Sequence, residues 1–315
     1  MQKNQLNNNT TSEQLWTPMR LNDVHQETLK VVNSIIDQIP DLPLSVNRIL
    51  EKITDEDSSL EELVGLVSSD PMLVSNILKV VNSSYYGLRH KTDNLRLAIV
   101  LLGFQEVKKI VLRSGLARTL GAGKAYKGYD TRELWLHSYL VSICAETFVS
   151  EDDKQGRGVL LTLGLLHDIG KFTLYDIGML LMKKGIKLKG MGNVAELDYL
   201  LEKEERLFGV NHNIVGRLLS KKWNLSERFI SVLECHHYPS FFDISEIPTE
   251  YEKEISAISI SDLIVNKFLN EKNILPEPHP HFFDLFGLNP PLESIITKDL
   301  VKKLEDAKEF VSLLN

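Results

Sequence analysis

Apolar residues recur along this chain with the spacing of helices rather than the alternation of strands. From about residue 22 onward, nearly every segment repeats its apolar side chains at intervals of three or four, the period of an amphipathic helix. Leu73, Ile77 and Val81 show it after Asp70 and Pro71, which suit an N-cap and a first helical turn. We therefore predict an all-α protein with short connections between helices.

Start and stop signals divide this pattern into separate helices. Ser58 and Glu61 predict a capping box, and Asp93 predicts the start of a helix that Gly103 ends. A cluster of glycines between residues 121 and 128 indicates a joint before the next helical segment. The order of elements predicts two packed helical lobes.

The ends of the chain differ from this helical body. The first residues are polar and rich in asparagine, so they offer too little apolar surface to offset the entropy of ordering. Prolines gather again after residue 275. We expect a disordered N-terminal tail over 1–20, an N-terminal helical lobe over 21–125, a second lobe over 126–270, and a Pro-rich joint with a closing helix over 271–315.

Composition narrows the classes of protein. Of the 315 residues, 43% are hydrophobic and 25% charged, as in ordinary globular proteins. The net charge of −7 argues against a broad nucleic-acid-binding surface. One weak basic stretch is explained better by a solvated helix face than by an anion site. It comprises Lys108, Lys109, Arg113, Arg118, Lys124 and Lys127.

Cysteine usage and hydropathy bear on the compartment. Cys144 and Cys235 are the two cysteines of the chain, which argues against a disulfide scaffold or a structural zinc knuckle. The sequence has no apolar run of roughly 20 residues and no secretory signal pattern. We expect a cytoplasmic protein without nucleic-acid or membrane partners.

Ionisable side chains that could bind a metal or take part in a reaction occur between residues 133 and 262, in apolar, helix-patterned surroundings. Burying so many imidazoles and carboxylates is unfavourable unless a shared group compensates them, and a metal ion would do so. The alternative is a set of histidines and caps that are each satisfied separately. The residues are Glu133, His137, His167, Asp168, Lys171, His212, His236, His237 and Asp262.

Spacing shows how some of these side chains could meet. Glu133 and His137 share one helix face, so they could form a buried hydrogen bond or supply two ligands. Adjacent helical residues point about 100° apart, so His167 and Asp168 reach one ion only near a helix end or bend. Gly170 supplies such a bend. A carboxylate in that place can bridge two ions.

The other members leave more than one interpretation open. Lys171 could neutralise a phosphoryl oxygen or reach solvent, and His236 and His237 could simply complement a helix dipole. His212 and Asp262 each interrupt an apolar stripe, and the aspartate needs a partner there. Imidazole and carboxylate donors without thiolates favour a mono- or dinuclear site for iron or manganese, with zinc or cobalt next, over a magnesium cage.

The order of several short motifs resembles the HDOD family. The resemblance covers about residues 36–245. Its N-terminal motifs are Leu42-Pro43-Leu44, Ser69-Asp70-Pro71, Val81-Asn82-Ser83-Ser84-Tyr85-Tyr86-Gly87 and Ala98-Ile99-Val100-Leu101-Leu102-Gly103. Its later motifs are Leu134-Trp135-Leu136-His137-Ser138, Leu165-Leu166-His167-Asp168-Ile169-Gly170-Lys171, and then Gly209, His212, Gly216, Trp223 and His236-His237.

This resemblance implies a bacterial, all-helical signalling module related to HD-domain phosphohydrolases, often working beside two-component or cyclic-di-GMP signalling. The ligand pattern is similar to that of HD-GYP phosphodiesterases, whereas residues 238–242 (Tyr-Pro-Ser-Phe-Phe) lack their Gly-Tyr-Pro signature. On this likeness, Asp168 and Lys171 are the candidate catalytic residues. The candidate metal ligands are Glu133, His137, His167, Asp168, His212, His236, His237 and Asp262.

Two functional hypotheses and a weaker third follow. In the first, which we favour, a metal cross-links the second lobe while the first lobe docks a signalling protein. In the second, the protein is a metal-dependent phosphodiesterase or phosphohydrolase acting on a nucleotide or cyclic dinucleotide. In the third, it is a metal-free scaffold whose histidines are relics.

Overall fold

The computed structural model confirms the all-α class. It describes residues 16–51, 59–120, 125–126, 129–185, 200–269 and 276–312. Within these ranges the regular elements are helices, apart from β1 (Ala125–Tyr126) and β2 (Tyr129–Asp130), which pair antiparallel. Two-residue strands are too short to form a sheet with a core of its own.

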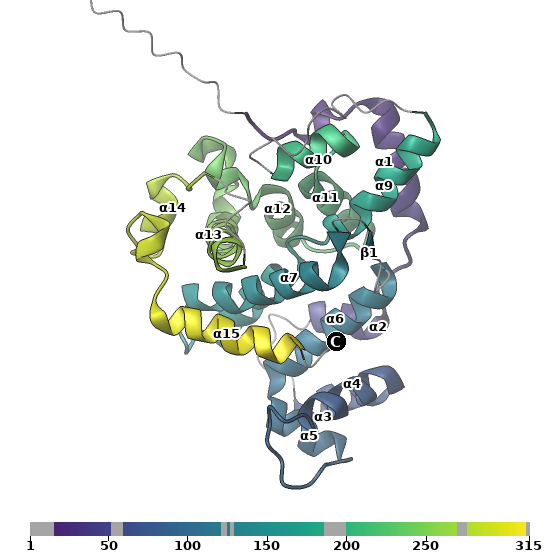
Figure 1. The fold of residues 1–315 in the computed structure, drawn as a ribbon, viewed down its shortest axis with the longest axis vertical. Coiled ribbons are helices and arrows are strands. Elements are labelled where there is room, and N and C mark those ends of the chain that lie inside the picture. The colour runs from purple at the N-terminus through teal and green to yellow at the C-terminus, as the bar shows by residue number, and fades with distance from the viewer. Residues whose placement is uncertain are drawn as a thin grey trace, which may run out of the picture.

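The N-terminal lobe is a group of helices that pack on one another at the lower part of Figure 1. Asp70 caps its third helix, as predicted, by accepting from the backbone N–H groups of Met72 and Leu73. Two other caps lie one residue later than predicted, because Ser59 forms the capping box with Glu62 and Asn94 caps the next helix. The described helices are α2 (Leu44–Glu51), α3 (Leu60–Ser68), α4 (Pro71–Val81), α5 (Leu95–Leu102) and α6 (Phe104–Leu120).

The second lobe surrounds helices that are apolar on nearly every side. All residues of α8 from Gly158 to Leu166 are buried, as expected for a helix in the centre of a fold. A side-chain carbon at Gly164 would lie 2.6 Å from the Cα atom of Ser142, so glycine lets α8 touch α7. The helices are α7 (Thr131–Ala145), α8 (Lys154–Leu166), α9 (Lys171–Lys183), α10 (Leu200–Phe208), α11 (His212–Lys222), α12 (Glu227–Cys235) and α13 (Glu252–Leu269).

Segments from both ends of the chain cover this second lobe. Helix α1 (Gln26–Gln38) packs on α9 and α11, and α15 (Lys298–Ser312) packs along α7, beyond the short α14 (Pro280–Asp284). Position in the sequence had placed α1 with the first lobe. Residues 1–15 of the expected tail lie outside the described residues, whereas residues 16–20 contact the second lobe.

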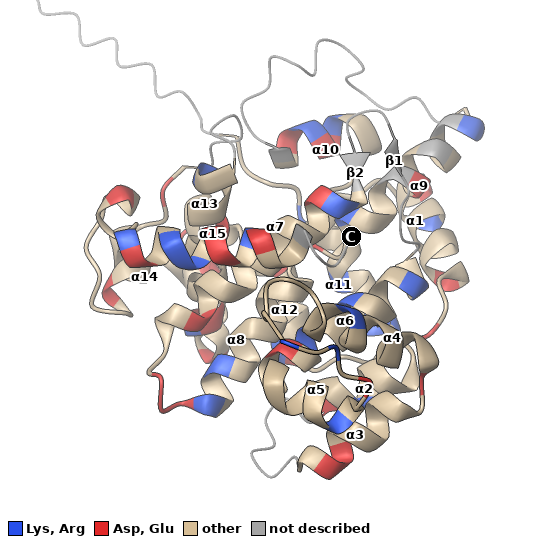
Figure 2. Ribbon diagram, turned by 60° about the horizontal axis from the view of Figure 1, so that its bottom comes forward, with Lys and Arg blue, Asp and Glu red and all other residues tan. Residues whose placement is uncertain are grey.

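No single helix among the described residues has both the length and the apolar composition to cross a membrane, although α3 and α4 together, bent by 116° where they meet, would reach that size. Acidic and basic residues are interspersed along the helices in Figure 2.

The basic stretch is not the solvated face that we expected. Lys108 and Lys109 are buried. The Nζ atom of Lys109 lies 2.8 Å from a carboxylate oxygen of Glu106, and Arg118 pairs with Asp70 at 2.6 Å. Lys124 and Lys127 lie outside the described residues. Lys109 and Arg118 thus form ion pairs, and of these two only Lys109 is buried.

Candidate metal centre

Seven of the candidate residues converge in the interior of the second lobe, and we call them the histidine–aspartate cluster. They come from α7, the end of α8, the start of α11, the end of α12 and the middle of α13. None is more than 9% exposed. The cluster consists of His137, His167, Asp168, His212, His236, His237 and Asp262.

A helix break brings the central aspartate into place. Helix α8 ends at Leu166 and α9 begins at Lys171, so His167 and Asp168 lie in the turn between them. A side-chain carbon at Gly170 would lie 2.0 Å from the carbonyl oxygen of His212. Glycine at this position therefore permits the contact between the α8–α9 turn and α11, as the predicted bend requires.

The two oxygens of Asp168 face different imidazoles. Its Oδ1 atom lies 3.2 Å from Nε2 of His212 and 3.8 Å from Nε2 of His236. Its Oδ2 atom lies 3.3 Å from Nε2 of His167 and 3.6 Å from Nε2 of His137. A carboxylate between two donor groups has the arrangement that bridges two metal ions.

Asp262 joins the same groups from the other side. Its Oδ1 atom lies 2.8 Å from Nε2 of His137, and its Oδ2 atom lies 3.7 Å from Nδ1 of His237. The side-chain amide of Asn266, one turn later, donates to Oδ1 at 3.0 Å. The aspartate in the apolar stripe of α13 thus has the polar partners that its burial requires.

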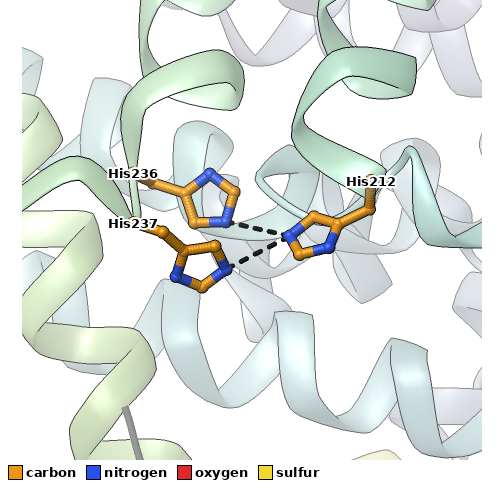
Figure 3. A group of neighbouring side chains, drawn as sticks. All are labelled: His212, His236 and His237. Carbon is orange, nitrogen blue, oxygen red and sulfur yellow. Dashed lines mark hydrogen bonds between the residues drawn. The ribbon is translucent and has the colours of Figure 1, made fainter. Parts of the chain in front are cut away.

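Figure 3 shows the imidazoles of His212, His236 and His237, which lie close together. The Nε2 atom of His212 lies 3.4 Å from Nε2 of His236 and 3.2 Å from Nε2 of His237. The Nδ1 atom of His212 lies 2.7 Å from Glu204, and Nδ1 of His236 lies 3.1 Å from the carbonyl oxygen of Leu233. Carboxylates and carbonyls accept hydrogen bonds, so both Nδ1 atoms are protonated and donate. The Nε2 atoms of the two rings therefore point toward each other.

This arrangement fits a cation. His167 is held in the same way, with Nδ1 2.7 Å from the carbonyl oxygen of Gly164. Within the described residues, Nε2 of His137, Nε2 of His167 and Oδ1 of Asp168 are buried without a hydrogen-bond partner. Buried polar atoms without a hydrogen-bond partner are destabilising, whereas imidazole nitrogens and carboxylate oxygens are good ligands for divalent transition metals.

The charges of the cluster also suit ligation. Burial raises the pKa of Asp168, but His167, Lys171 and His212 outweigh it and hold that pKa well below its usual range. The pKa of Asp262 is likewise well below its usual range, because its interactions with the nearby imidazoles of His137 and His167 outweigh burial.

The histidines split into two kinds. Burial lowers the pKa of His236 far below its ordinary value and that of His237 to about 3. Burial would also lower the pKa of His167, but Asp168 and Asp262 outweigh it and raise the value to about 9. His236 and His237 are therefore neutral donors at pH 7, the form that binds a metal.

Lys171 is part of this environment. Its side chain is buried, so the expectation that it could reach solvent is wrong, and its Nζ atom lies 2.5 Å from Oδ2 of Asp168. Burial would lower its pKa, but Asp168, Glu204 and Asp262 raise it. The ammonium group thus places a fixed positive charge beside the central carboxylate.

Glu133 is not brought to the cluster. Its side chain is exposed, although it shares a helix face with His137. Helix α7 reaches the cluster only at His137, and Arg132 and Glu133 lie at the surface. The prediction that Glu133 points inward is therefore contradicted.

Glu204 is the functional residue that the sequence did not single out. It is buried, and one of its oxygens accepts from both Nδ1 and the backbone N–H of His212, at 2.7 and 2.9 Å. Such outer carboxylates orient metal-binding histidines. The two residues are eight positions apart and a helix break lies between them, so no helical period reveals the pair.

Comparison with known families agrees with this site. A profile of the HDOD domain matches residues 39–239, which is well over half of the chain. The protein belongs to the HDOD family. The resemblance in sequence motifs is thereby confirmed.

Individual relatives are distant. An uncharacterised protein of Treponema pallidum (strain Nichols) is 25% identical over 256 residues, which cover 79% of this chain and 46% of the relative. The chain therefore spans less than half the length of that relative.

Three solved structures share the fold at lower sequence identity. A candidate signal transduction protein from Marinobacter aquaeolei VT8 has a TM-score of 0.68 and 16% identity, over 91% of this chain and 66% of that one. An HDOD domain protein of unknown function from Geobacter sulfurreducens has a TM-score of 0.57 and 21% identity, over 91% and 93%. A candidate metal-dependent phosphohydrolase from Shewanella amazonensis SB2B has 0.57 and 17%, over 91% and 98%.

Proposed function

We propose that this HDOD protein is a metal-binding signalling protein of the bacterial cytoplasm that acts mainly through contact with a partner protein. The burial of the histidine–aspartate cluster carries this proposal. Asp168, His212 and His236 are fully buried. A catalytic metal site keeps a coordination position open for water or substrate, whereas a structural site is closed by protein ligands.

A metal in this place would join helices that otherwise meet through a polar core. The donors lie on α7, α11, α12 and α13 and on the α8–α9 turn. Iron or manganese suits the mixed imidazole and carboxylate donors, with zinc or cobalt next. Such an ion would fix the relative positions of these helices, and its binding would report on the state of the lobe.

The N-terminal lobe supplies a surface for the partner. The large hydrophobic side chains that are exposed among the described residues all belong to this lobe, and three of them lie on α5. An exposed apolar surface of this kind is typical of protein contacts. The residues are Leu44, Met72, Tyr85, Leu97, Val100 and Leu101.

The alternative is a metal-dependent phosphodiesterase or phosphohydrolase acting on a nucleotide or cyclic dinucleotide. The two-sided placement of Asp168 and the charge of Lys171 favour it. A bound metal pair would supply Lewis-acid activation of water. Asp168 and Asp262 would hold the ligand geometry, and Lys171 would place positive charge near a phosphoryl oxygen.

Metal content and turnover separate these hypotheses. Protein purified without chelators should hold at least about one divalent ion per chain, and a value under roughly a tenth would leave only the metal-free scaffold. With its metal bound, the protein should not hydrolyse cyclic dinucleotides, (p)ppGpp or simple phosphodiesters. Hydrolysis that Asp168→Ala abolishes would overturn our preference.

The partner surface has its own test. Replacing Leu97 and Val100 together by aspartate should abolish complementation of a deletion strain while metal content and melting temperature stay unchanged. Lys303→Asp, an exposed change on α15, is the matched control and should complement fully. Full complementation by the α5 variant would contradict a docking role for this lobe.

A further inference from the structure

The first described residues form a strap on the outside of the metal-site lobe. We call residues 16–20 the N-terminal strap; Figure 1 shows this start of the chain, in purple, passing beside α10 before α1. The ring of Trp16 meets the ring of Phe241 edge-on, with centroids 5.6 Å apart. The guanidinium of Arg20 lies 4.7 Å from the centre of Phe242 and 3.2 Å from Glu246.

The backbone of Met19 closes a ring of hydrogen bonds in the middle of the strap. Its N–H donates to Oε1 of Glu205 at 2.7 Å, and its carbonyl accepts from the side-chain amide of Asn211 at 3.1 Å. The same amide donates to Oε1 of Glu205 at 2.7 Å. Both hydrogen-bonding groups of one peptide residue are thus used by side chains of the α10–α11 corner.

The α10–α11 corner carries His212, a member of the histidine–aspartate cluster. Asn211 caps α11 by accepting from the N–H of Ile214 at 3.1 Å, and His212 is the first residue of that helix. Glu204 and Glu205 are neighbours on α10. Glu204 accepts a hydrogen bond from the imidazole of His212, and Glu205 accepts one from the backbone of Met19 in the strap.

The ends of the strap contact a second supporting segment. Phe241 and Phe242 follow His236 and His237 by only a few residues. Trp16 and Arg20 therefore pack on the chain that leaves the paired histidines, while Met19 is bonded to the corner that presents His212. The three imidazoles of Figure 3 come from these two segments.

We propose that the N-terminal strap is a positioning element of the metal centre, so that docking of the strap and occupation of the centre favour each other. The inference rests on the proposed function, because it requires a metal at the cluster. Coupling between two binding events is reciprocal: a docked strap tightens metal binding by the same factor by which metal tightens the strap.

Variants in the full-length chain test one direction of this coupling. Trp16→Ala and Arg20→Ala remove partly buried or exposed contacts outside the lobe core, so the fold should persist. Each should weaken Mn²⁺ and Zn²⁺ binding about five- to tenfold, measured by competition with a chelator. Lys303→Ala, a change at an exposed residue of α15, should leave both dissociation constants unchanged. Glu204→Gln, which acts on His212 directly, should weaken binding about 10- to 100-fold.

Hydrogen exchange tests the other direction. The amide of Met19 should exchange more slowly in Zn²⁺-loaded protein than in chelated protein. The ratio of the two exchange rates should be about equal to the factor by which Trp16→Ala raises the dissociation constant for the metal. The inference would be overturned if both strap variants bound metal as tightly as the wild type and the exchange rate at Met19 were the same with and without Zn²⁺. That result would leave the proposed metal site standing. Wild-type protein that binds neither metal would overturn both.

Discussion

The two lobes solve the problem of a buried interior in different ways. The N-terminal lobe fills its centre with apolar side chains such as Val46, Leu73 and Ile77. The second lobe places five imidazoles and two carboxylates in its centre. Hydrophobic burial needs no further partner, whereas a polar centre is stable only when every group is compensated.

Their surfaces differ in the opposite sense. The N-terminal lobe, whose centre is apolar, exposes large hydrophobic side chains, among them Met72 and Val100. No large hydrophobic side chain is exposed to this extent among the described residues of the second lobe. This contrast suggests a division of labour. Under the proposed function, the first lobe offers a contact surface and a bound metal completes the interior of the second lobe.

The largest expected effect is that metal removal destabilises the second lobe and leaves the N-terminal lobe unchanged. At a free metal concentration of about 100 to 1,000 times the dissociation constant, chelation should lower the free energy of unfolding by about 3–4 kcal/mol. Hydrogen exchange followed by mass spectrometry should place the loss of protection in α7, α11, α12 and α13. In the His236→Asn variant, metal-loaded and chelated protein should have the same free energy of unfolding and the same pattern of protection.

Ile77→Ala is the control in the other lobe. The side chain is fully buried in α4, and its truncation should cost about 2–5 kcal/mol in the presence or absence of metal. A metal-dependent cost at Ile77, or a uniform loss of protection on chelation, would show that the lobes unfold as one unit and that the contrast is only local.

Glycines give a second, metal-independent contrast. Gly170→Ala would place a methyl group against the backbone of α11, and backbone cannot move aside as a side chain can, so the change should cost about 3 kcal/mol in urea denaturation. Gly65→Ala on α3 meets nothing within 4 Å and should stabilise the protein by up to about 1 kcal/mol. A tolerated Gly170→Ala would mean that the α8–α9 turn has room to shift.

Much of the site was predictable because its signals are local. The bend at Gly170, the pairing of His167 with Asp168 and the aspartate in the stripe of α13 each depend on neighbours within one or two helical turns. The helix caps were predictable to within one residue for the same reason: adjacent polar residues compete for one position.

What the sequence did not reveal depends on contacts between distant segments. Met19 and Glu205 are 186 residues apart, and a polar leading segment gives no sign that its peptide groups will be bound. The amphipathic pattern of α1 shows that it has an apolar face, but not which lobe that face covers. Glu133 illustrates the converse, because sharing a helix face with His137 does not place it at the same depth.

The last expected effect concerns the pH dependence of the second lobe and involves Glu205. Burial raises the pKa of Glu205 to about 7, outweighing the hydrogen bonds from Met19 and Asn211. The folded protein therefore holds this proton more tightly than the unfolded chain does. As pH rises from about 4.5 to 7, the unfolded state releases the proton first, so the contribution of Glu205 to stability is complete below pH 4.5 and is lost by about pH 7.

Glu205→Gln isolates this effect, because glutamine keeps an oxygen that can accept from Met19 and Asn211 but cannot titrate. Above pH 7 the variant should be more stable than the wild type by about 1–3 kcal/mol, allowing for partial exposure of the side chain. The two proteins should converge near pH 4.5. Parallel stability curves across this range in urea denaturation would mean that Glu205 keeps an ordinary pKa.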